Sequence, residues 1–185
     1  MRIIGGTLKG LTLASVGKGD KAGHLRPTSD RVRESIFNLL QNGGYGNPIL
    51  GARVLDLFAG TGALGLEALS RGAAWVTFVD EGAKAQSLLR HNIELCRATE
   101  KTRLISKNAL RLGPCEDAAY DLIFLDPPYG KYLGEKALIS AIENGWLANE
   151  ALIVWEENSE KPSPPGLSRH DARRYGDTWV HILSN

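Results

Sequence analysis

A regular alternation of strand-like and helix-like segments, beginning at about Arg53, is the strongest constraint on the fold. The strand-like runs are short and rich in aliphatic and aromatic residues: VLDLF, WVTFVD, RLIS, YDLIFLD and ALIVWEE. Between them lie segments with the apolar spacing of helices, namely GALGLEALSRG, residues 83–97 and residues 133–144. Strands that alternate with helices at this interval favour a parallel sheet with helices on both faces, so we predict an α/β fold.

The two ends of the chain predict different additions to this sheet. RIIGGTLKGLTL predicts two short strands, ASVGKGDKAG a flexible polar stretch, and RPTSDRVRESIFNLL a helix capped by Thr28 or Ser29. Arg31 and Arg33 are predicted to lie off the apolar stripe of this helix, which is formed by Val32, Ile36, Leu39 and Leu40. The tail predicts a closing antiparallel hairpin that turns at Gly176 and Asp177. We expect one domain over 1–185, with an extension over 1–45 and a core over 46–185 that holds a mostly parallel seven-stranded sheet.

Composition limits the class of protein and the ligands. The 185 residues suit one globular domain, and no apolar run reaches the roughly 18 residues of a membrane span. MRIIGGTLKG does not have the pattern of a secretory signal, so we expect a cytoplasmic protein without a membrane partner. Two cysteines and four scattered histidines have no ligand spacing, so we expect no metal.

The segment DLFAGTGALG joins a predicted strand to a predicted helix, where parallel sheets bind ligands. Gly60 and Gly62 would let the backbone approach a ligand, and Asp80, at the end of the next strand, could accept hydrogen bonds from ribose hydroxyls. The glycines also satisfy GxGxxG, so this pattern alone does not separate a nicotinamide cofactor from S-adenosylmethionine. It disfavours a nucleoside triphosphatase, because no GK[ST] follows the glycines.

The motif DPPY, at Asp126, Pro127, Pro128 and Tyr129, ends the fourth strand-like run of the core. The exocyclic amino group of a base is a poor nucleophile because its lone pair is delocalised into the ring. The Asp126 carboxylate and the Pro127 carbonyl could accept its two hydrogens and favour a pyramidal nitrogen facing a methyl donor. Proline keeps the carbonyl rigidly aimed, and Tyr129 offers a face on which a base can stack.

Together with LRPTSDRVRESIFN, VTFVD and RRYGDT, these motifs resemble the bacterial ribosomal small-subunit methyltransferase D family over nearly the whole chain. That family consists of 16S rRNA guanine-N2 methyltransferases with the Rossmann-like class I methyltransferase fold. The resemblance implies S-adenosylmethionine as cofactor and 16S rRNA, within an assembled or assembling small subunit, as partner. It implies that Asp126–Tyr129 receive the guanine amino group. Cofactor contacts are implied for Asp56, Phe58, Gly60, Thr61, Gly62, Asp80, Asn108 and Ala109.

Charge is distributed unevenly along the chain. Residues 1–40 contain seven Lys or Arg against three acids, whereas residues 111–160 contain three against ten. A basic face attracts phosphate backbones, so we predict a basic rim that contacts RNA. Its predicted members are Lys9, Arg26, Arg31, Arg33, Arg173 and Arg174, the last two of which could instead stabilise the closing hairpin. We expect a monomer.

The sequence leaves several alternatives to this function open. DNA adenine-N6 methylation and protein glutamine-N5 methylation use the same DPPY chemistry, although the chain offers no separate region for recognising a DNA target. A non-catalytic nucleoside-binding assembly factor and a nicotinamide oxidoreductase would share the glycine loop. Binding of nicotinamide cofactor without methyl transfer would identify the oxidoreductase.

Overall fold

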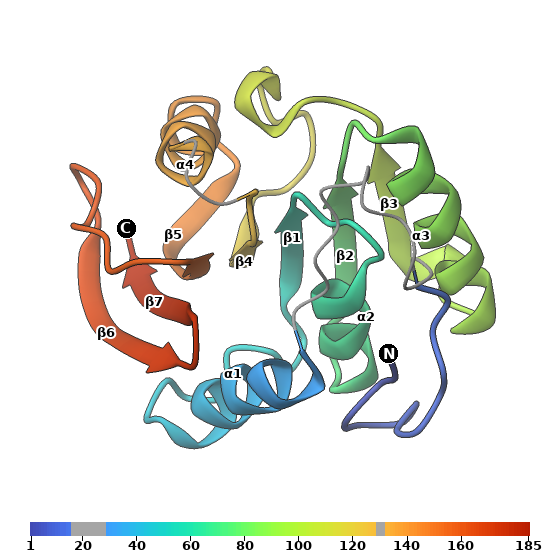
Figure 1. Cartoon of the computed structure of the whole chain (residues 1–185). Coiled ribbons are helices and arrows are strands. Elements are labelled where there is room, and N and C mark those ends of the chain that lie inside the picture. Colours follow the sequence, from blue (N-terminus) through green and yellow to red (C-terminus); the bar gives the residue numbers. More distant parts are fainter. Residues whose placement is uncertain (16–28, 129–131) are drawn as a thin grey trace.

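The computed structural model describes residues 1–15, 29–128 and 132–185. Seven strands form one sheet in the order β3-β2-β1-β4-β5-β7-β6, which runs across the molecule in Figure 1. The parallel strands are β1 (Arg53–Leu57), β2 (Trp75–Val79), β3 (Thr102–Ile105), β4 (Tyr120–Leu125) and β5 (Leu147–Glu157). β7 (Thr178–Ser184) pairs antiparallel with β5 and with β6 (Ser168–Tyr175). The α/β fold with a mostly parallel, seven-stranded sheet is therefore confirmed, as is the closing hairpin.

Helices cover both faces of the sheet because residues along each strand alternate between two hydrophobic clusters. One cluster joins Val54, Val76 and Phe124 of the strands to α1 (Asp30–Asn42), α2 (Ala63–Ser70) and α3 (Ala83–Leu95). The other joins Leu55, Ile123 and Ile153 to α4 (Leu133–Glu143) and the 3₁₀ helix η2 (Ala109–Arg111). A second 3₁₀ helix, η1 (Thr99–Lys101), precedes β3. The sheet is thus buried on both sides, as parallel sheets usually are.

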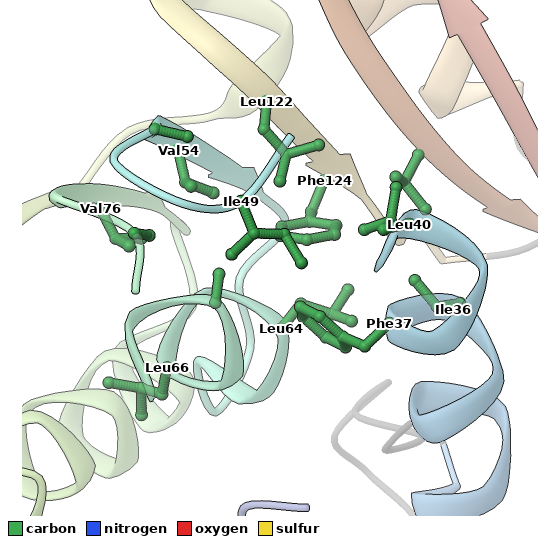
Figure 2. Packing of buried hydrophobic residues seen from close by; sticks show 14 of the residues in the cluster. Ile36, Phe37, Leu40, Ile49, Val54, Leu64, Leu66, Val76, Leu122 and Phe124 are labelled. Carbon is green, nitrogen blue, oxygen red and sulfur yellow. The ribbon is translucent and has the colours of Figure 1, made fainter. Parts of the chain in front are cut away.

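Helix α1 packs against the centre of the sheet. Ser29 caps it by accepting a hydrogen bond from the Val32 amide at 3.2 Å, which confirms one of the two predicted capping residues. Its side chains point toward α2 and β4 in Figure 2, and the rings of Phe37 and Phe124 lie 5.6 Å apart. Because Ile3 and Leu13 join the same cluster, the predicted extension over 1–45 shares the core of the sheet.

The N-terminal segment differs from the predicted strand pair. Its only pairing of strand type among the described residues is a single antiparallel bridge between Arg2 and Thr12. The chain between them turns at Gly5 and Gly6 against the end of α2, where the Thr7 amide donates to the Ser70 carbonyl at 2.7 Å. Contacts with α2 therefore replace most of the ladder that a regular hairpin would form. The predicted flexible stretch over 14–23 lies largely outside the described residues.

Candidate active site

The candidate site lies at the carboxyl edge of the sheet, between β1 and β4. In the order β3-β2-β1-β4-β5 the chain builds outward from β1 in both directions, so the strand order reverses there. Ligands of open α/β sheets bind beyond the carboxyl ends of the strands at this switch point. The β1–α2 loop, the end of β2 and the residues after β4 all belong to this edge. The fold therefore brings the predicted cofactor and catalytic motifs to one place.

Asp56, near the end of β1, binds the start of α2, the helix that follows the glycine loop between β1 and α2. Its side chain is buried, and its Oδ2 accepts a hydrogen bond from the Gly65 amide in the first turn of α2 at 3.0 Å. Burial raises the pKa of Asp56 well above its ordinary value, the Gly65 hydrogen bond opposes that shift, and the charges of Asp126 and Asp80 add to it. Three carboxyl groups therefore interact at this edge, although they come from three different strands.

The loop after β1 has an unusual backbone. Phe58 has a φ of 59°, which is uncommon for a residue with a side chain, and Gly60 and Gly62 have φ values of 56° and 78°. Gly62 begins α2 without a side-chain cap, and a Cβ there would overlap the Leu89 side chain of α3. Non-glycine residues in the left-handed region are concentrated at functional sites, so this turn is a good candidate for a ligand cradle.

Asp80 follows β2 directly and binds the glycine loop through a hydrogen bond. Its Oδ2 accepts from the Gly60 amide and its Oδ1 from the Gly82 amide, each at 2.8 Å. Burial raises the pKa of Asp80, the hydrogen bonds from Gly82 and Gly60 lower it, and the nearby charge of Glu81 raises it. A carboxylate offers about four acceptor positions, so two remain for ligand hydroxyls. Asp80 therefore fits a group that carries two neighbouring hydroxyls, such as a ribose.

Asn108 and Ala109 lie at the start of η2, beyond β3. The Asn108 side chain accepts from the Leu110 amide at 2.8 Å and donates to the Glu81 carboxylate at 3.1 Å, while Ala109 is buried. The contact with Glu81, the residue after Asp80, brings this turn to the side of the site where Asp80 lies. These two hydrogen bonds fix the Asn108 side chain near Asp80. Its contact with adenine stays a prediction.

The residues that follow β4 sit between the ends of β1 and β5. Asp126 and Pro128 are partly exposed and Pro127 is buried. Leu125 pairs with Leu57 on one side and with Trp155 on the other, so Asp126 leaves the sheet beside both strands. Tyr129 lies outside the described residues, and so does its predicted stacking role. The first three residues of DPPY are thus at the rim that the sequence predicts.

Arg33 is buried and does not lie on the surface where the sequence predicts it. The sequence predicts it on a basic rim, but its side chain is buried on the inner face of α1. Its Nη2 donates to the Arg2 carbonyl at 2.6 Å and to Asp30 Oδ1 at 2.9 Å. Burial lowers the pKa of Arg33, whereas the charges of Asp30, Glu67 and Glu156 raise it. A guanidinium enclosed in this way links the N-terminal segment to α1 and is not available to RNA in this structure.

The other predicted basic residues differ in position. Lys9 and Arg31 are exposed, and Arg26 lies outside the described residues. Arg173 pairs with Val180, which pairs with Glu156, so the register places β6 at the level of the carboxyl end of β5. Arg173 Nε binds Asp171 Oδ2 at 2.7 Å and Arg174 Nε donates to the Gly176 carbonyl at 2.9 Å. These local bonds agree with a role in the hairpin, while contact with RNA stays a prediction for all five residues.

Two residues at or in α3 that the sequence analysis missed bind either the loop or the Asp80 side chain that holds it. Gly82, which precedes α3, binds Asp80, and Asn92, on the buried face of α3, donates to the Thr61 carbonyl at 2.9 Å. Asn92 occupies a position on the apolar stripe that includes Leu89 and Ile93. A polar residue in such a stripe is a signal that could have identified it.

The described residues contain no cluster of His, Cys, Asp or Glu that could hold a metal ion. Within the same ranges, no helix is long and apolar enough to cross a membrane.

Comparison with known proteins gives concordant results. The family model "Conserved hypothetical protein 95" matches residues 1–184. Ribosomal RNA small subunit methyltransferase D of Escherichia coli is 40% identical over 164 residues, covering 89% of this chain and 78% of that protein. A Bacillus subtilis protein named "Putative rRNA methyltransferase YlbH" is 40% identical over 98% of this chain and 97% of its own length. A solved structure from Escherichia coli, "Putative methyltransferase yhhF", has a TM-score of 0.82 and 36% identity, covering 100% of this chain and 97% of that one.

Proposed function

The chain belongs to the ribosomal RNA small subunit methyltransferase D family, and from this premise we propose that it methylates 16S rRNA at the exocyclic N2 of a guanine. The methyl donor in this proposal is S-adenosylmethionine. One observation carries the proposal: the acid-proline-proline sequence after β4 lies beside the glycine loop and its two supporting carboxylates, at the switch point of the sheet.

The residues at this edge fit the cofactor. Asp80 retains acceptor positions for the ribose hydroxyls, and the left-handed turn at Gly60 and Gly62 offers backbone groups to the rest of the molecule. Asn108, Ala109 and Phe58 would line the adenine side, and Thr61 would complete the loop. S-adenosylmethionine, when bound, would supply an electrophilic methyl group on a sulfonium ion, and breaking of that carbon–sulfur bond would release S-adenosylhomocysteine.

The residues after β4 perform the remaining chemistry in this proposal. The Asp126 carboxylate and the Pro127 carbonyl accept the two hydrogens of the guanine amino group and orient its lone pair. As the nitrogen gains its methyl group it becomes acidic, so its proton can pass to Asp126 or to water. No strong base is required, and orientation supplies most of the rate enhancement. Tyr129 would stack on the base.

The substrate is proposed on two grounds. Three relatives that match 88% or more of this chain are named for small-subunit rRNA or for rRNA, which favours RNA over DNA or a protein amide. Exposed Lys9, Arg31, Arg173 and Arg174 would contact phosphates, with Arg26 as a further candidate. We propose that the substrate is the assembled or assembling small subunit and that the enzyme acts as a monomer.

The test follows labelled methyl groups from S-adenosylmethionine into four acceptors: small subunits reconstituted from unmodified 16S rRNA, the naked rRNA, duplex DNA and total ribosomal protein. Nucleoside analysis should find N2-methylguanosine in the rRNA. Label in N6-methyladenine or in glutamine would support the corresponding alternative. Cofactor binding without any transfer would support the assembly factor, and NAD binding without S-adenosylmethionine binding would support the oxidoreductase.

A further inference from the structure

Three polar side chains of α2 and α3 hold the N-terminal segment, residues 1–15. Glu67 is buried and accepts from the amides of Ile4 and Gly5 at 2.7 and 2.8 Å. Ser70 accepts from the Leu8 amide and donates to the Gly5 carbonyl. Asn92 binds the far end of the segment, at Ala14. The segment is therefore fixed by side chains from the core in addition to its own antiparallel bridge and backbone hydrogen bonds.

Asn92 differs from the other two because it also contacts the cofactor loop. Its Oδ1 accepts from the Ala14 amide at 2.7 Å, and its Nδ2 donates to the Ala14 carbonyl at 3.0 Å and to the Thr61 carbonyl at 2.9 Å. The side chain is fully buried. One amide group thus joins two chain segments that are distant in sequence, and its removal would leave buried polar groups without partners.

Thr61 lies at the centre of the loop, between two glycines with positive φ. Asp80 fixes the loop at the Gly60 amide, and Asn92 fixes it one residue later, at the Thr61 carbonyl. The N-terminal segment also contacts Thr61 directly, because Met1 Sδ lies 3.8 Å from Thr61 Oγ1. A turn held from both sides has little freedom to change shape unless the N-terminal segment also moves.

We propose that Asn92 is a positioning residue that couples docking of residues 1–15 to the shape of the cofactor loop. The inference rests on the proposed function, because it takes the loop to hold S-adenosylmethionine. Binding of the methyl donor and ordering of the N-terminal segment then strengthen each other, since coupling between two sites is reciprocal. The N-terminal segment is in this sense connected to the cofactor site through Asn92.

The first experiment uses the wild-type protein. Amide hydrogen exchange is measured with and without S-adenosylmethionine at Ile3, Gly10 and Leu13, whose amides form hydrogen bonds inside the segment. Coupling predicts that the cofactor slows their exchange by about fivefold or more. A cofactor that binds and supports methyl transfer without slowing this exchange would overturn the inference alone. A protein that does not bind S-adenosylmethionine would overturn both the inference and the proposed function.

The second experiment compares Asn92→Ala with Ser70→Ala as the matched control. Ser70 also binds the segment, but it has no hydrogen bond with the loop among the described residues. Asn92→Ala should raise the Kd and the KM for S-adenosylmethionine about fivefold or more and abolish the effect of cofactor on exchange, while kcat at saturating cofactor stays near the wild-type value. Ser70→Ala should change the Kd less than about twofold.

Equal increases in Kd for the two variants would mean that Asn92 acts only through stability, and would overturn the proposal. Asn92→Asp supplies a second variant, because it is isosteric and keeps the acceptor for the Ala14 amide. It replaces the donor with a carboxylate oxygen facing the carbonyls of Ala14 and Thr61, so its Kd should rise at least as much as that of Asn92→Ala. A wild-type Kd in Asn92→Asp would contradict the coupling.

Discussion

The amino and carboxyl edges of the sheet differ in the partners of their charged side chains. At the amino edge, β1, β2 and β4 begin with Arg53, Trp75 and Tyr120, and the Arg53 guanidinium lies 5.8 Å from the Trp75 ring centroid and 5.1 Å from that of Tyr120. Asp121 accepts from the Arg53 amide at 2.8 Å. At this edge the guanidinium of Arg53 lies near two aromatic rings, and the carboxylate of Asp121 accepts a hydrogen bond from a backbone amide.

The carboxyl edge of the same three strands gathers like charges instead. Asp56, Asp80 and Asp126 lie at or just after the ends of β1, β2 and β4. The pKa of Asp56 is raised by burial and further by the charges of the other two, and burial also raises the pKa of Asp80. Carboxylates held together in this way cost stability, and perturbed groups of this kind cluster at functional sites. We propose that the amino edge serves stability and the carboxyl edge chemistry.

The sharpest test of this difference uses Asp121, near the start of β4, and Asp126, directly after its end. Asp126→Ala should reduce kcat for rRNA methylation by about 100-fold or more, because the acceptor that orients the reacting nitrogen is lost. Asp121→Ala, at the opposite end of the strand, should keep wild-type activity because it lies at the amino edge. Initial rates with labelled cofactor measure both, and thermal unfolding checks that both variants fold. Equal losses of activity would remove the distinction between the edges.

A second prediction concerns cofactor affinity. Asp80→Asn should raise the Kd for S-adenosylmethionine about tenfold or more, because hydrogen bonds to a charged acceptor are stronger than neutral ones. Titration calorimetry measures the Kd. Asp117→Asn, which removes an acid that pairs with Arg103 away from the site, is the matched control. An unchanged Kd in Asp80→Asn would exclude the proposed ribose contact.

A smaller effect is expected for RNA binding. Arg31 is exposed in the first turn of α1, so Arg31→Ala should lower the slope of log K against log salt for rRNA by about one unit. Arg103→Ala removes an exposed arginine that pairs with Asp117 and should leave the slope unchanged. Filter binding over a range of salt concentrations measures both slopes. Equal slopes for wild type and Arg31→Ala would remove Arg31 from the interface.

The smallest expected effect is on stability as a function of pH. Because folding raises the pKa of Asp56, the native state favours its protonated form, and the associated stability is lost as pH rises from about 4 through the folded-state pKa. The free energy of unfolding of wild type relative to Asp56→Asn should therefore decrease toward neutral pH. Urea unfolding at several pH values measures this difference. A difference that increases with pH would contradict the raised pKa.

Local patterns were sufficient for most of the fold. The alternation of strands and helices, the Ser29 cap and the turn at Gly176 and Asp177 were predicted because periodicity and turn chemistry are local properties. The predicted N-terminal strand pair is reduced to one antiparallel bridge, since RIIGGTLKGLTL has strand-like composition but the amides of Ile4, Gly5 and Leu8 bind Glu67 and Ser70. These partners lie more than sixty residues away in sequence, at separations of 63 and 62.

Arg33 shows the same limit for charge. Arginine on a helix is usually exposed, so Arg33 was assigned to the surface although it stands three, four and seven residues before the buried Ile36, Phe37 and Leu40. Its partner, the Arg2 carbonyl, is distant in sequence. Asn92 was missed for a related reason: its partners, Ala14 and Thr61, come from two other segments.

The sequence by itself determined the order of elements, the glycine turn and the acid that ends each of two strands, because these depend on residue type and near neighbours. Only the tertiary structure decided which of these groups meet. Asp56, Asp80 and Asp126 interact because parallel pairing aligns the ends of β1, β2 and β4, and Asn92 joins Ala14 to Thr61 because α3 packs beside both. Such contacts depend on hydrogen bonding and burial between segments distant in sequence, which no local pattern encodes.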